Sequence, residues 1–216
     1  MRVALVGAHG KVGRVLRPAL QEAGHEVTPI GRDDRLEVAG HDAAINFTRP
    51  DAVYVTVRRC LEQGVPGVVG TTGLGREELD ALGDLAREQN VPLFVAPNFS
   101  VGAVLMMRLA GEASRVLPRA EIVELHHESK HDAPSGTAKA TAERMGGAVS
   151  IHSVRLPGLV AHQEVLFGEP GGMLTIRHDA FSREAYVPGV LLVLEKLSTL
   201  PPGLTLGLDA LLDSDH

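Results

Sequence analysis

The residue types best suited to acid–base chemistry and anion binding gather between positions 126 and 137. They are two adjacent histidines, a lysine and a Ser-Gly-Thr run, namely His126, His127, Lys130, Ser135, Gly136 and Thr137. A histidine can act as a general acid at neutral pH, because its unperturbed pKa is about 6.5. An ammonium group and free backbone N–H groups bind carboxylates. The pattern therefore indicates a site for a small anion that carries more than one carboxylate.

The neighbouring segments predict how these residues are held. Residues 121–125 are short, largely apolar and β-permissive, which places the two histidines at the end of a strand. Residues 137–145 are typical of a helix, and Pro134 and Ser135 are start signals for it. Gly136 permits close approach of the backbone to an anion. We expect a strand end and a helix N-terminus to face each other.

A glycine-rich run near the N-terminus is typical of nucleotide binding. Gly7-Ala8-His9-Gly10-Lys11-Val12-Gly13 lies between a predicted strand, Arg2–Val6, and a predicted helix, Lys11–Ala23. The glycines allow a tight turn that brings a pyrophosphate to the helix N-terminus. The spacing is G-x-x-G-x-x-G and not the commoner G-x-G-x-x-G, so a purely structural turn remains the alternative. Lys11 suits a phosphate contact, and its alternative is a solvated helix charge.

The end of the second predicted strand bears on the choice of dinucleotide. An arginine at this point can pair with the 2′-phosphate of NADP, whereas an acid binds the ribose hydroxyls of NAD. Arg32 occupies the arginine position, and Asp33, twenty residues after Gly13, could still reach a ribose. We therefore expect NADPH to be accepted at least as well as NADH, with Arg32 as an ordinary loop charge as the alternative.

Strands alternate with helices through the first hundred residues. The predicted strands are Arg2–Val6, Glu26–Ile30, Ala43–Phe47, Gly67–Gly70 and Leu93–Ala96, and the helices between them are Lys11–Ala23, Pro50–Gln63 and Arg76–Gln89. This alternation predicts an α/β fold with a Rossmann-like, doubly wound parallel sheet. A helix over Val101–Leu117 should follow, with an apolar face formed by Val101, Val104, Leu105, Leu109 and Val116. Met106 and Met107 suit core packing.

The pattern changes after residue 121. Three further strands, at Ser150–Leu156, Glu164–Phe167 and Met173–His178, are separated by Gly/Pro turns and indicate a smaller α+β domain with a mostly antiparallel open sheet. A helix is predicted over Val190–Leu200, and an apolar strand after Pro201-Pro202-Gly203.

Composition limits the classes of protein that the chain can be. The 216 residues are 44% hydrophobic and 22% charged, which is ordinary for a soluble globular protein of one large domain or two modest lobes. A net charge of −6 disfavours a nucleic-acid surface, and no apolar run approaches the roughly 20 residues that cross a bilayer. The N-terminus lacks the pattern of a secretory signal. One cysteine, Cys60, suits a reducing cytoplasm and a structural role better than a nucleophilic one.

The run from Glu124 to Ala138 resembles the signature of the dihydrodipicolinate reductase family, roughly E-x-H-H-x-x-K-x-D-x-P-S-G-T-A. Other segments that resemble the family occur in order and span most of the chain. They are Gly7 to Gly13, Phe47-Thr48-x-Pro50, Gly70-Thr71-Thr72-Gly73, Ala96-Pro97-Asn98-Phe99-Ser100-Val101-Gly102 and Ser182-Arg183-Glu184-Ala185-Tyr186-Val187-Pro188-Gly189.

The resemblance implies an NADPH- or NADH-dependent reductase of the diaminopimelate route to lysine, acting on dihydrodipicolinate or its hydrated precursor. It implies a discontinuous dinucleotide-binding domain, residues 1–99 and 184–216, and a substrate-binding and oligomerisation domain, residues 100–183, in a homotetramer. His126 would be the general acid, assisted by Lys130. The dicarboxylate substrate would be held by His127, Lys130, Ser135, Gly136 and Thr137.

The resemblance also implies further dinucleotide contacts, each of which could instead be an ordinary β–α turn. They are Phe47, Thr48, Gly70, Thr71, Thr72, Ala96, Pro97, Asn98 and Phe99. The chain departs from the family pattern at Asn46, where an aspartate is common, and at Gln163, where a histidine is common. These departures bear on cofactor preference and loop closure more than on the type of reaction.

Several alternatives stay open. Adjacent histidines on a strand point to opposite faces, so His126 or His127 could be a packed structural residue. A zinc site lacks the usual spacing of histidines and cysteines. Another two-domain dehydrogenase, such as an aspartate dehydrogenase, and a non-catalytic NAD(P)-binding sensor share the predicted nucleotide lobe. An aspartate dehydrogenase would not be expected to carry H-H-x-x-K with P-S-G-T, and a sensor needs neither an acid nor a carboxylate clamp.

Overall fold

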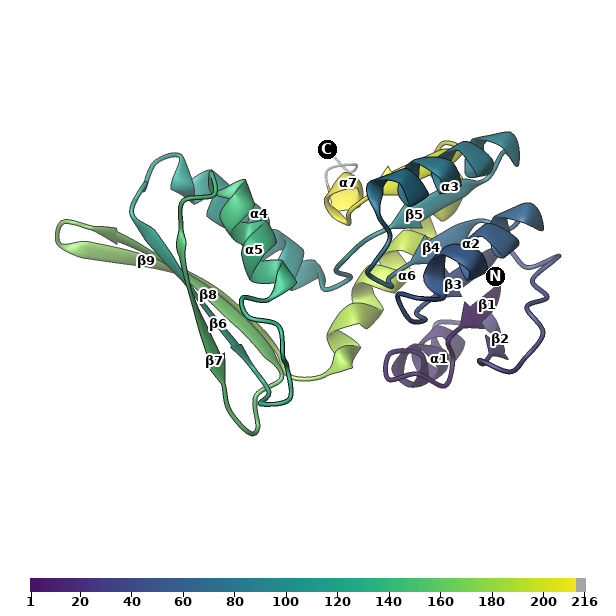
Figure 1. The fold of residues 1–216 in the computed structure, drawn as a ribbon, viewed down its shortest axis with the longest axis horizontal. Coiled ribbons are helices and arrows are strands. Elements are labelled where there is room, and N and C mark those ends of the chain that lie inside the picture. The colour runs from purple at the N-terminus through teal and green to yellow at the C-terminus, as the bar shows by residue number, and fades with distance from the viewer. Residues whose placement is uncertain (213–216) are drawn as a thin grey trace. The chain divides into compact units, whose positions relative to one another are not determined.

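The computed structural model describes residues 1–212 and divides the chain into two compact units (Figure 1). The first unit contains Met1–Phe99 and the C-terminal segment that begins at Tyr186, and the second is Ser100–Ala185. The chain thus leaves the first unit and returns to it. We expected the second unit to end at residue 183, and it extends two residues further, to Ala185.

The first unit is built on a six-stranded sheet. Its strands are β1 (Arg2–Val6), β2 (Glu26–Ile30), β3 (Ala43–Asn46), β4 (Gly67–Val69), β5 (Pro92–Val95) and β10 (Gly203–Leu206). All pairs are parallel, in the order β10-β5-β4-β3-β1-β2. The central strands β3 and β4 are buried along their whole length, as expected for parallel strands covered on both faces. The predicted parallel sheet is confirmed.

Helices pack on this sheet through their apolar sides. They are α1 (Gly13–Glu22), α2 (Val53–Glu62), α3 (Arg76–Glu88) and α6 (Val187–Lys196), and short helices follow at Leu197–Thr199 and Asp209–Leu212 (α7). In Figure 1, α2 and α3 lie together over one face, and α1 and α6 lie on the other. Leu16 of α1, Leu82 of α3 and Val193 of α6 are fully or almost fully buried. The arrangement is a Rossmann-like, doubly wound fold.

The strand order reverses at β1, which has β2 on one side and β3 on the other. The turns after these strands therefore diverge and leave a crevice at their carboxyl ends, the place where doubly wound sheets bind ligands. The Phe47 N–H extends the ladder by donating to the carbonyl of Val6 at 3.0 Å. Gly7 and Phe47 consequently lie side by side at this edge.

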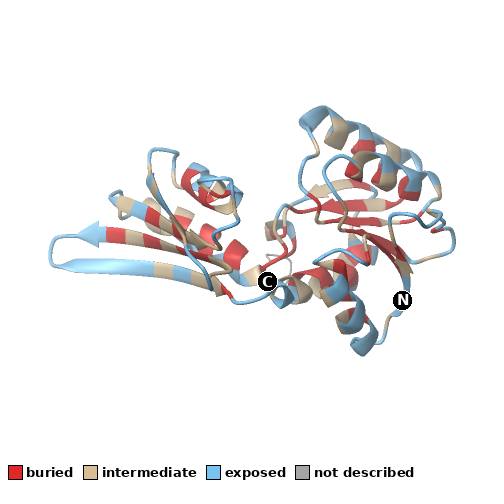
Figure 2. Cartoon of the chain, turned by 60° about the horizontal axis from the view of Figure 1, so that its bottom comes forward, coloured by how far each residue is buried: buried red, intermediate tan, exposed pale blue. Residues whose placement is uncertain are grey.

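The second unit is a four-stranded sheet with two helices. Its main elements are α4 (Val101–Ser114), β6 (Ala120–His126), α5 (Gly136–Arg144), β7 (Ser150–Arg155), β8 (Ala161–Glu169) and β9 (Gly172–Ala180), and a short 3₁₀ helix, Arg183–Tyr186, follows them. The order is β7-β6-β8-β9, with β6–β7 parallel and the other two pairs antiparallel. The predicted, mostly antiparallel sheet is confirmed. Its core joins Ile122 of β6 and Phe167 of β8 to Ala138 of α5, all of them fully buried. Figure 2 shows buried residues along the sheet and the helices that cover it.

The predicted apolar face of the first helix in this unit was only partly right, because Val104 is buried but three other members are exposed. Leu105, Leu109 and Val116 are exposed, whereas Met106 and Met107 are buried as expected. The α4 sequence is apolar on almost all sides, so the spacing of its apolar residues does not show which side of the helix is buried. Packing against β9 and α5 selects the side that contains the methionines.

Among the helices of residues 1–212, none has both the length and the apolar character required to cross a membrane.

Candidate active site

The end of β6 carries His126 beside a buried carboxylate. Glu124 is 0% exposed, and one of its oxygens lies 2.5 Å from Nδ1 of His126. An ionised carboxylate can only accept hydrogen bonds, so Nδ1 must be the donor. Side chains two residues apart on a strand project to the same face, which brings the pair together. His126 is thereby fixed through one ring nitrogen, and the other ring nitrogen, Nε2, takes no part in this contact.

Arg155 binds the same carboxylate from the neighbouring strand. It lies opposite His126 in the β6–β7 register, and its two terminal nitrogens donate to the two oxygens of Glu124 at 2.9 and 2.8 Å. Such a bidentate ion pair is geometrically specific and stronger than a single hydrogen bond between neutral groups. The N–H of Ser135 also donates to Glu124, at 3.3 Å.

The environment shifts the pKa values of both members of the Glu124–His126 pair. Burial alone would raise the pKa of Glu124, but hydrogen bonds from Arg155, Ser153 and His126 outweigh it and lower this pKa. Burial lowers the pKa of His126, and the neighbouring Glu124 carboxylate partly offsets that effect. The Glu124 carboxylate is therefore ionised at neutral pH, and protonated His126 is a stronger acid than a free histidine.

The loop after β6 presents Lys130. Its ammonium contacts both carboxylate oxygens of Asp132, at 2.7 and 2.8 Å, and this pairing lowers the pKa of Asp132. His127 bonds to the Ser129 hydroxyl at 2.8 Å instead of sharing the partners of His126. His131 is exposed, and no role is assigned to it.

The helix that follows begins where its sequence predicts. Ser135 is the N-cap of α5, and its hydroxyl oxygen accepts from the Ala138 N–H at 3.2 Å. Ser135 is buried, whereas Gly136 is exposed and a methyl group added to it would meet no atom within 4 Å. The open positions at this helix N-terminus are therefore Gly136 and Thr137. Five of the six predicted catalytic and substrate residues lie on the loop and helix start that follow His126.

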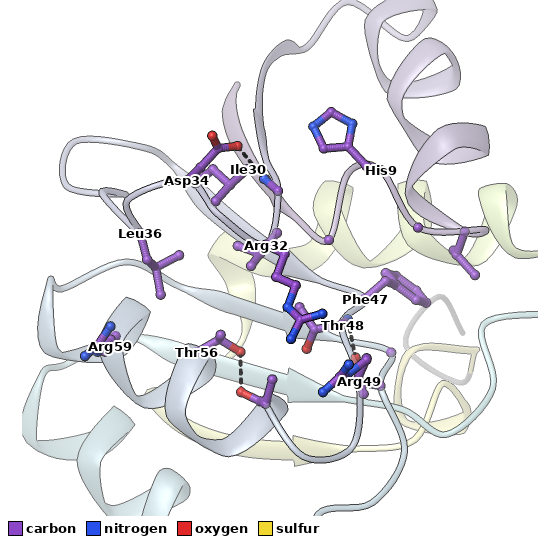
Figure 3. Close-up of a pocket in the computed structure, with 18 of the residues that line it drawn as sticks. His9, Ile30, Arg32, Asp34, Leu36, Phe47, Thr48, Arg49, Thr56 and Arg59 are labelled. Atoms are coloured by element: carbon purple, nitrogen blue, oxygen red, sulfur yellow. Dashed lines mark hydrogen bonds between the residues drawn. The ribbon is translucent and has the colours of Figure 1, made fainter.

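A separate cavity of about 1330 Å³ lies at the carboxyl ends of β1–β4 in the first unit (Figure 3). Many predicted cofactor residues line it, namely Gly7, His9, Gly10, Lys11, Val12, Arg32, Phe47, Thr48, Gly70, Thr71 and Thr72. The cavity is larger than the roughly 300–1,000 Å³ of ordinary small-molecule pockets, as an extended dinucleotide requires.

The glycine turn fits the pyrophosphate of such a cofactor. Gly7 has φ +86°, and a methyl group on it would overlap the carbonyl of Phe47. A methyl group on Gly13 would overlap the Gly7–Ala8 backbone. Within the described residues, α1 receives no side-chain hydrogen bond from its N-cap Val12 and has no acid in its first turn. Its N–H groups and the nearby Lys11 therefore suit an anion.

Arg32 projects into the cavity from the end of β2, as Figure 3 shows. Its neighbour Asp34, not Asp33, lines the cavity, and the Asp34 carboxylate accepts from the N–H of Gly31 at 2.7 Å. Asp34 was not predicted from the sequence, and neither were Arg49 and Arg59, which lie along the cavity wall. Arg49 follows a predicted contact directly, so its position was a usable signal. Arg59 belongs to α2 and is not adjacent to any predicted contact, so the sequence offers no comparable indication for it.

Asn46 connects the turns that follow β3 and β4. Its amide donates to the Thr56 hydroxyl at 2.7 Å, and its oxygen accepts from Thr48 at 2.8 Å. The Thr71 hydroxyl in turn accepts from the N–H of Thr48 at 2.7 Å. Because the Thr56 hydroxyl donates to helix carbonyls, it can accept from an amide, which explains how asparagine is accommodated here.

The remaining predicted cofactor residues lie outside the cavity wall. They are Ala8, Gly13, Asp33, Ala96, Pro97, Asn98 and Phe99. Phe99 is buried against the ring of Phe47, with ring centroids 5.5 Å apart, so it supports the wall from behind. Ala96 is buried as well.

The cysteine and the potential metal ligands of the chain are its other candidate reactive groups. Burial raises the pKa of Cys60 to about 12, so its thiol carries no nucleophilic charge at neutral pH. Within residues 1–212, no cluster of three histidine, cysteine or carboxylate side chains could hold a metal ion.

The doubly wound lobe with its dinucleotide-sized cavity, combined with an imidazole and an open helix N-terminus, defines an NAD(P)H-dependent oxidoreductase. Models of the N-terminus and the C-terminus of dihydrodipicolinate reductase match residues 1–99 and 102–212. The chain belongs to the dihydrodipicolinate reductase family.

Individual relatives agree with this assignment. The 4-hydroxy-tetrahydrodipicolinate reductase of Moorella thermoacetica is 40% identical and that of Nocardia farcinica 42%, and each alignment covers at least 98% of both proteins. The solved structure of dipicolinate-bound dihydrodipicolinate reductase from a Paenisporosarcina species has a TM-score of 0.83 at 32% identity, covering 97% of this chain and 98% of that one. An aspartate dehydrogenase from Thermotoga maritima has a TM-score of 0.55 at 11% identity and shares the fold alone.

Proposed function

We propose that the enzyme reduces 4-hydroxy-tetrahydrodipicolinate, or the dihydrodipicolinate formed from it by loss of water, to tetrahydrodipicolinate in the diaminopimelate route to lysine. Reduction of a cyclic α,β-unsaturated imine adds one hydride to a ring carbon and one proton to its neighbour. The bound nicotinamide supplies the hydride. The chain must supply the proton and hold the two carboxylates.

His126 is the proton donor in this proposal. As an imidazolium it carries a proton on each nitrogen, and Glu124 keeps the one on Nδ1. The proton on Nε2 passes to the substrate, which leaves a neutral imidazole that still donates to Glu124. Burial lowers the pKa of His126, which favours this transfer. The carboxylate contact at Nδ1, 2.5 Å long, is the observation that carries the proposal.

The substrate carboxylates are assigned to the loop and helix start after β6. Lys130 exchanges its Asp132 partner for a substrate carboxylate, and the N–H groups of Gly136 and Thr137 bind a carboxylate at the positive end of α5. The open space beside Gly136 supports this assignment. Ser135 contributes its hydroxyl proton, because its oxygen already caps the helix, and His127 completes the set.

A coupled assay tests the reaction. Freshly generated 4-hydroxy-tetrahydrodipicolinate is mixed with the enzyme and NADPH or NADH, and the loss of absorbance of the reduced nicotinamide is followed. Saturable oxidation that requires the substrate is expected. Oxidation with oxaloacetate and ammonia instead would indicate an aspartate dehydrogenase, and tight dinucleotide binding without turnover would indicate a sensor.

We further propose a cytoplasmic homotetramer joined through the smaller sheets. The exposed Met173 and Leu174 on the edge strand β9 support such contacts, whereas Val165 and Phe167 of β8 are buried within their own unit. One buried cysteine suits a reducing compartment. Light scattering coupled to gel filtration should give four times the 22.9 kDa chain mass, and a monomer mass would reject the assembly.

A further inference from the structure

Glu124 is a fully buried acid in the middle of a strand. An ionised carboxylate without water is costly unless charged partners and hydrogen bonds surround it. Glu124 has such partners on three sides, because His126, Arg155 and the N–H of Ser135 all donate to it. These partners come from the strand end, from β7 and from the start of α5. A single carboxylate therefore joins the three segments that carry the proposed chemistry.

Arg155 extends the same connection into the loop. Its Nε donates to the carbonyl of Lys130 at 3.2 Å, and one terminal nitrogen donates to the carbonyl of Asp132 at 2.7 Å. The guanidinium thus holds the backbone on both sides of residue 131 while it binds Glu124. Lysine could not make this set of contacts, because its ammonium lacks the planar fork.

We propose that Glu124 and Arg155 are the positioning residues of this active site: Glu124 fixes the ring and the protonation of His126, and Arg155 fixes the loop that presents Lys130. The proposal rests on the assignment of His126 and Lys130 above. Neither positioning residue touches the substrate. Glu124 acts through the imidazole, and Arg155 acts through two carbonyls and through Glu124.

The charges around His126 predict how the pH dependence of activity responds to a change at Glu124. Burial lowers the pKa of His126 most strongly. Glu124, on the same strand, raises this pKa, and the positive charges of Lys130 in the loop and Arg155 on β7 lower it. Asp132 pairs with Lys130 and is also close to Arg155. Removing the charge of Glu124 must therefore lower the pKa of His126 further. A general acid works only while protonated, so the loss of activity at high pH must move to lower pH.

Glu124→Gln keeps the shape and tests this shift. The expected result is a high-pH limb of kcat/KM that moves to lower pH, with a loss of about 10-fold or more at pH 8 and a smaller loss at pH 6. Glu121→Gln is the matched control, because Glu121 also bonds to a histidine, His152, at 2.8 Å, but on the exposed part of β6. A uniform loss with an unmoved limb would overturn the role of Glu124.

Arg155→Lys tests the loop. Because Lys130 would lose its support, KM for the substrate should rise about 10-fold or more, with a smaller change in kcat and an unchanged Kd for NADPH. An unchanged KM, or a fall in kcat alone, would overturn the role of Arg155. Dinucleotide binding and circular dichroism show whether each variant is folded.

A measurement on the wild-type protein remains decisive if a variant fails to fold. In ¹⁵N spectra, the signals of His126 are identified because they disappear in His126→Gln. At a pH where His126 is neutral, its single ring proton should lie on Nδ1. A proton on Nε2 would refute the proposed hydrogen bond to Glu124. Normal turnover of His126→Gln would instead remove the proposed proton donor, so failure of that assignment is distinguishable from failure of the positioning roles.

Discussion

Arg155 and Glu124 are joined by two hydrogen bonds, 2.9 and 2.8 Å long, across the parallel pair β6 and β7. The same guanidinium donates to the carbonyl of Asp132 at 2.7 Å. The loop that carries Lys130 is therefore tied to the strand that carries His126. This connection allows the consequences of changing single residues to be stated separately.

Replacement of His126 by glutamine removes the proposed acid and retains a polar side chain. We expect kcat to fall by about 10²-fold or more with a modest change in KM, because proton donation is needed in the transition state and not for binding. Steady-state kinetics measure both constants. Near-normal turnover would exclude His126 as the donor.

Lys130→Ala should weaken substrate capture as well as turnover. The ammonium now pairs with Asp132, and without it a substrate carboxylate loses a charge-assisted hydrogen bond worth about 1.5–3 kcal/mol, or roughly 10- to 100-fold in kcat/KM. His131→Ala, an exposed change in the same loop, is the control. Unchanged KM and kcat in Lys130→Ala would show that this ammonium does not engage the substrate.

Arg32→Ala should distinguish the two cofactors. We expect KM for NADPH to rise about 10-fold and KM for NADH to change little, because only NADPH carries the 2′-phosphate that the guanidinium can bind. Arg17→Ala, exposed on α1 and outside the cavity, is the comparison. Equal effects on both cofactors would reject this contact, and a wild-type preference for NADH of more than tenfold would reject the predicted use of NADPH.

Gly7→Ala should abolish dinucleotide binding and lower the melting temperature. Gly24 is the matched control, because its φ of +83° is nearly the +86° of Gly7 but an added methyl group there meets no atom within 4 Å. Gly24→Ala should therefore lose only the roughly 1–2 kcal/mol of the left-handed conformation. In Gly7→Ala the methyl group also overlaps the carbonyl of Phe47. Equal losses of stability would show that this close approach is unimportant.

The parallel lobe was predictable because its evidence is local. Continuous apolar runs such as Val3–Val6 alternate with amphipathic helices, and the Gly7 turn lies between the first pair of elements. The helix start at Ser135 was predictable for the same reason, since capping depends on adjacent residues.

The role of Glu124 was not predictable from its own segment. The residue belongs to the recognised motif, but a charged residue on a strand is ordinarily read as exposed, and its partner Arg155 lies 31 positions away. Asp33 was predicted to contact the cofactor, but Asp34 lines the cavity, because the path of the turn after β2 decides which of the two faces it. Both features depend on long-range packing or turn geometry, which composition and periodicity do not encode.

A crystal structure with NADPH and a planar pyridine dicarboxylate tests the central claim most directly. The ligand should place its carboxylates on Lys130 and on the N–H groups of Gly136 and Thr137, with Nε2 of His126 facing the ring. A ligand bound elsewhere, with residues 126–137 left in contact with solvent, would contradict the proposed active site.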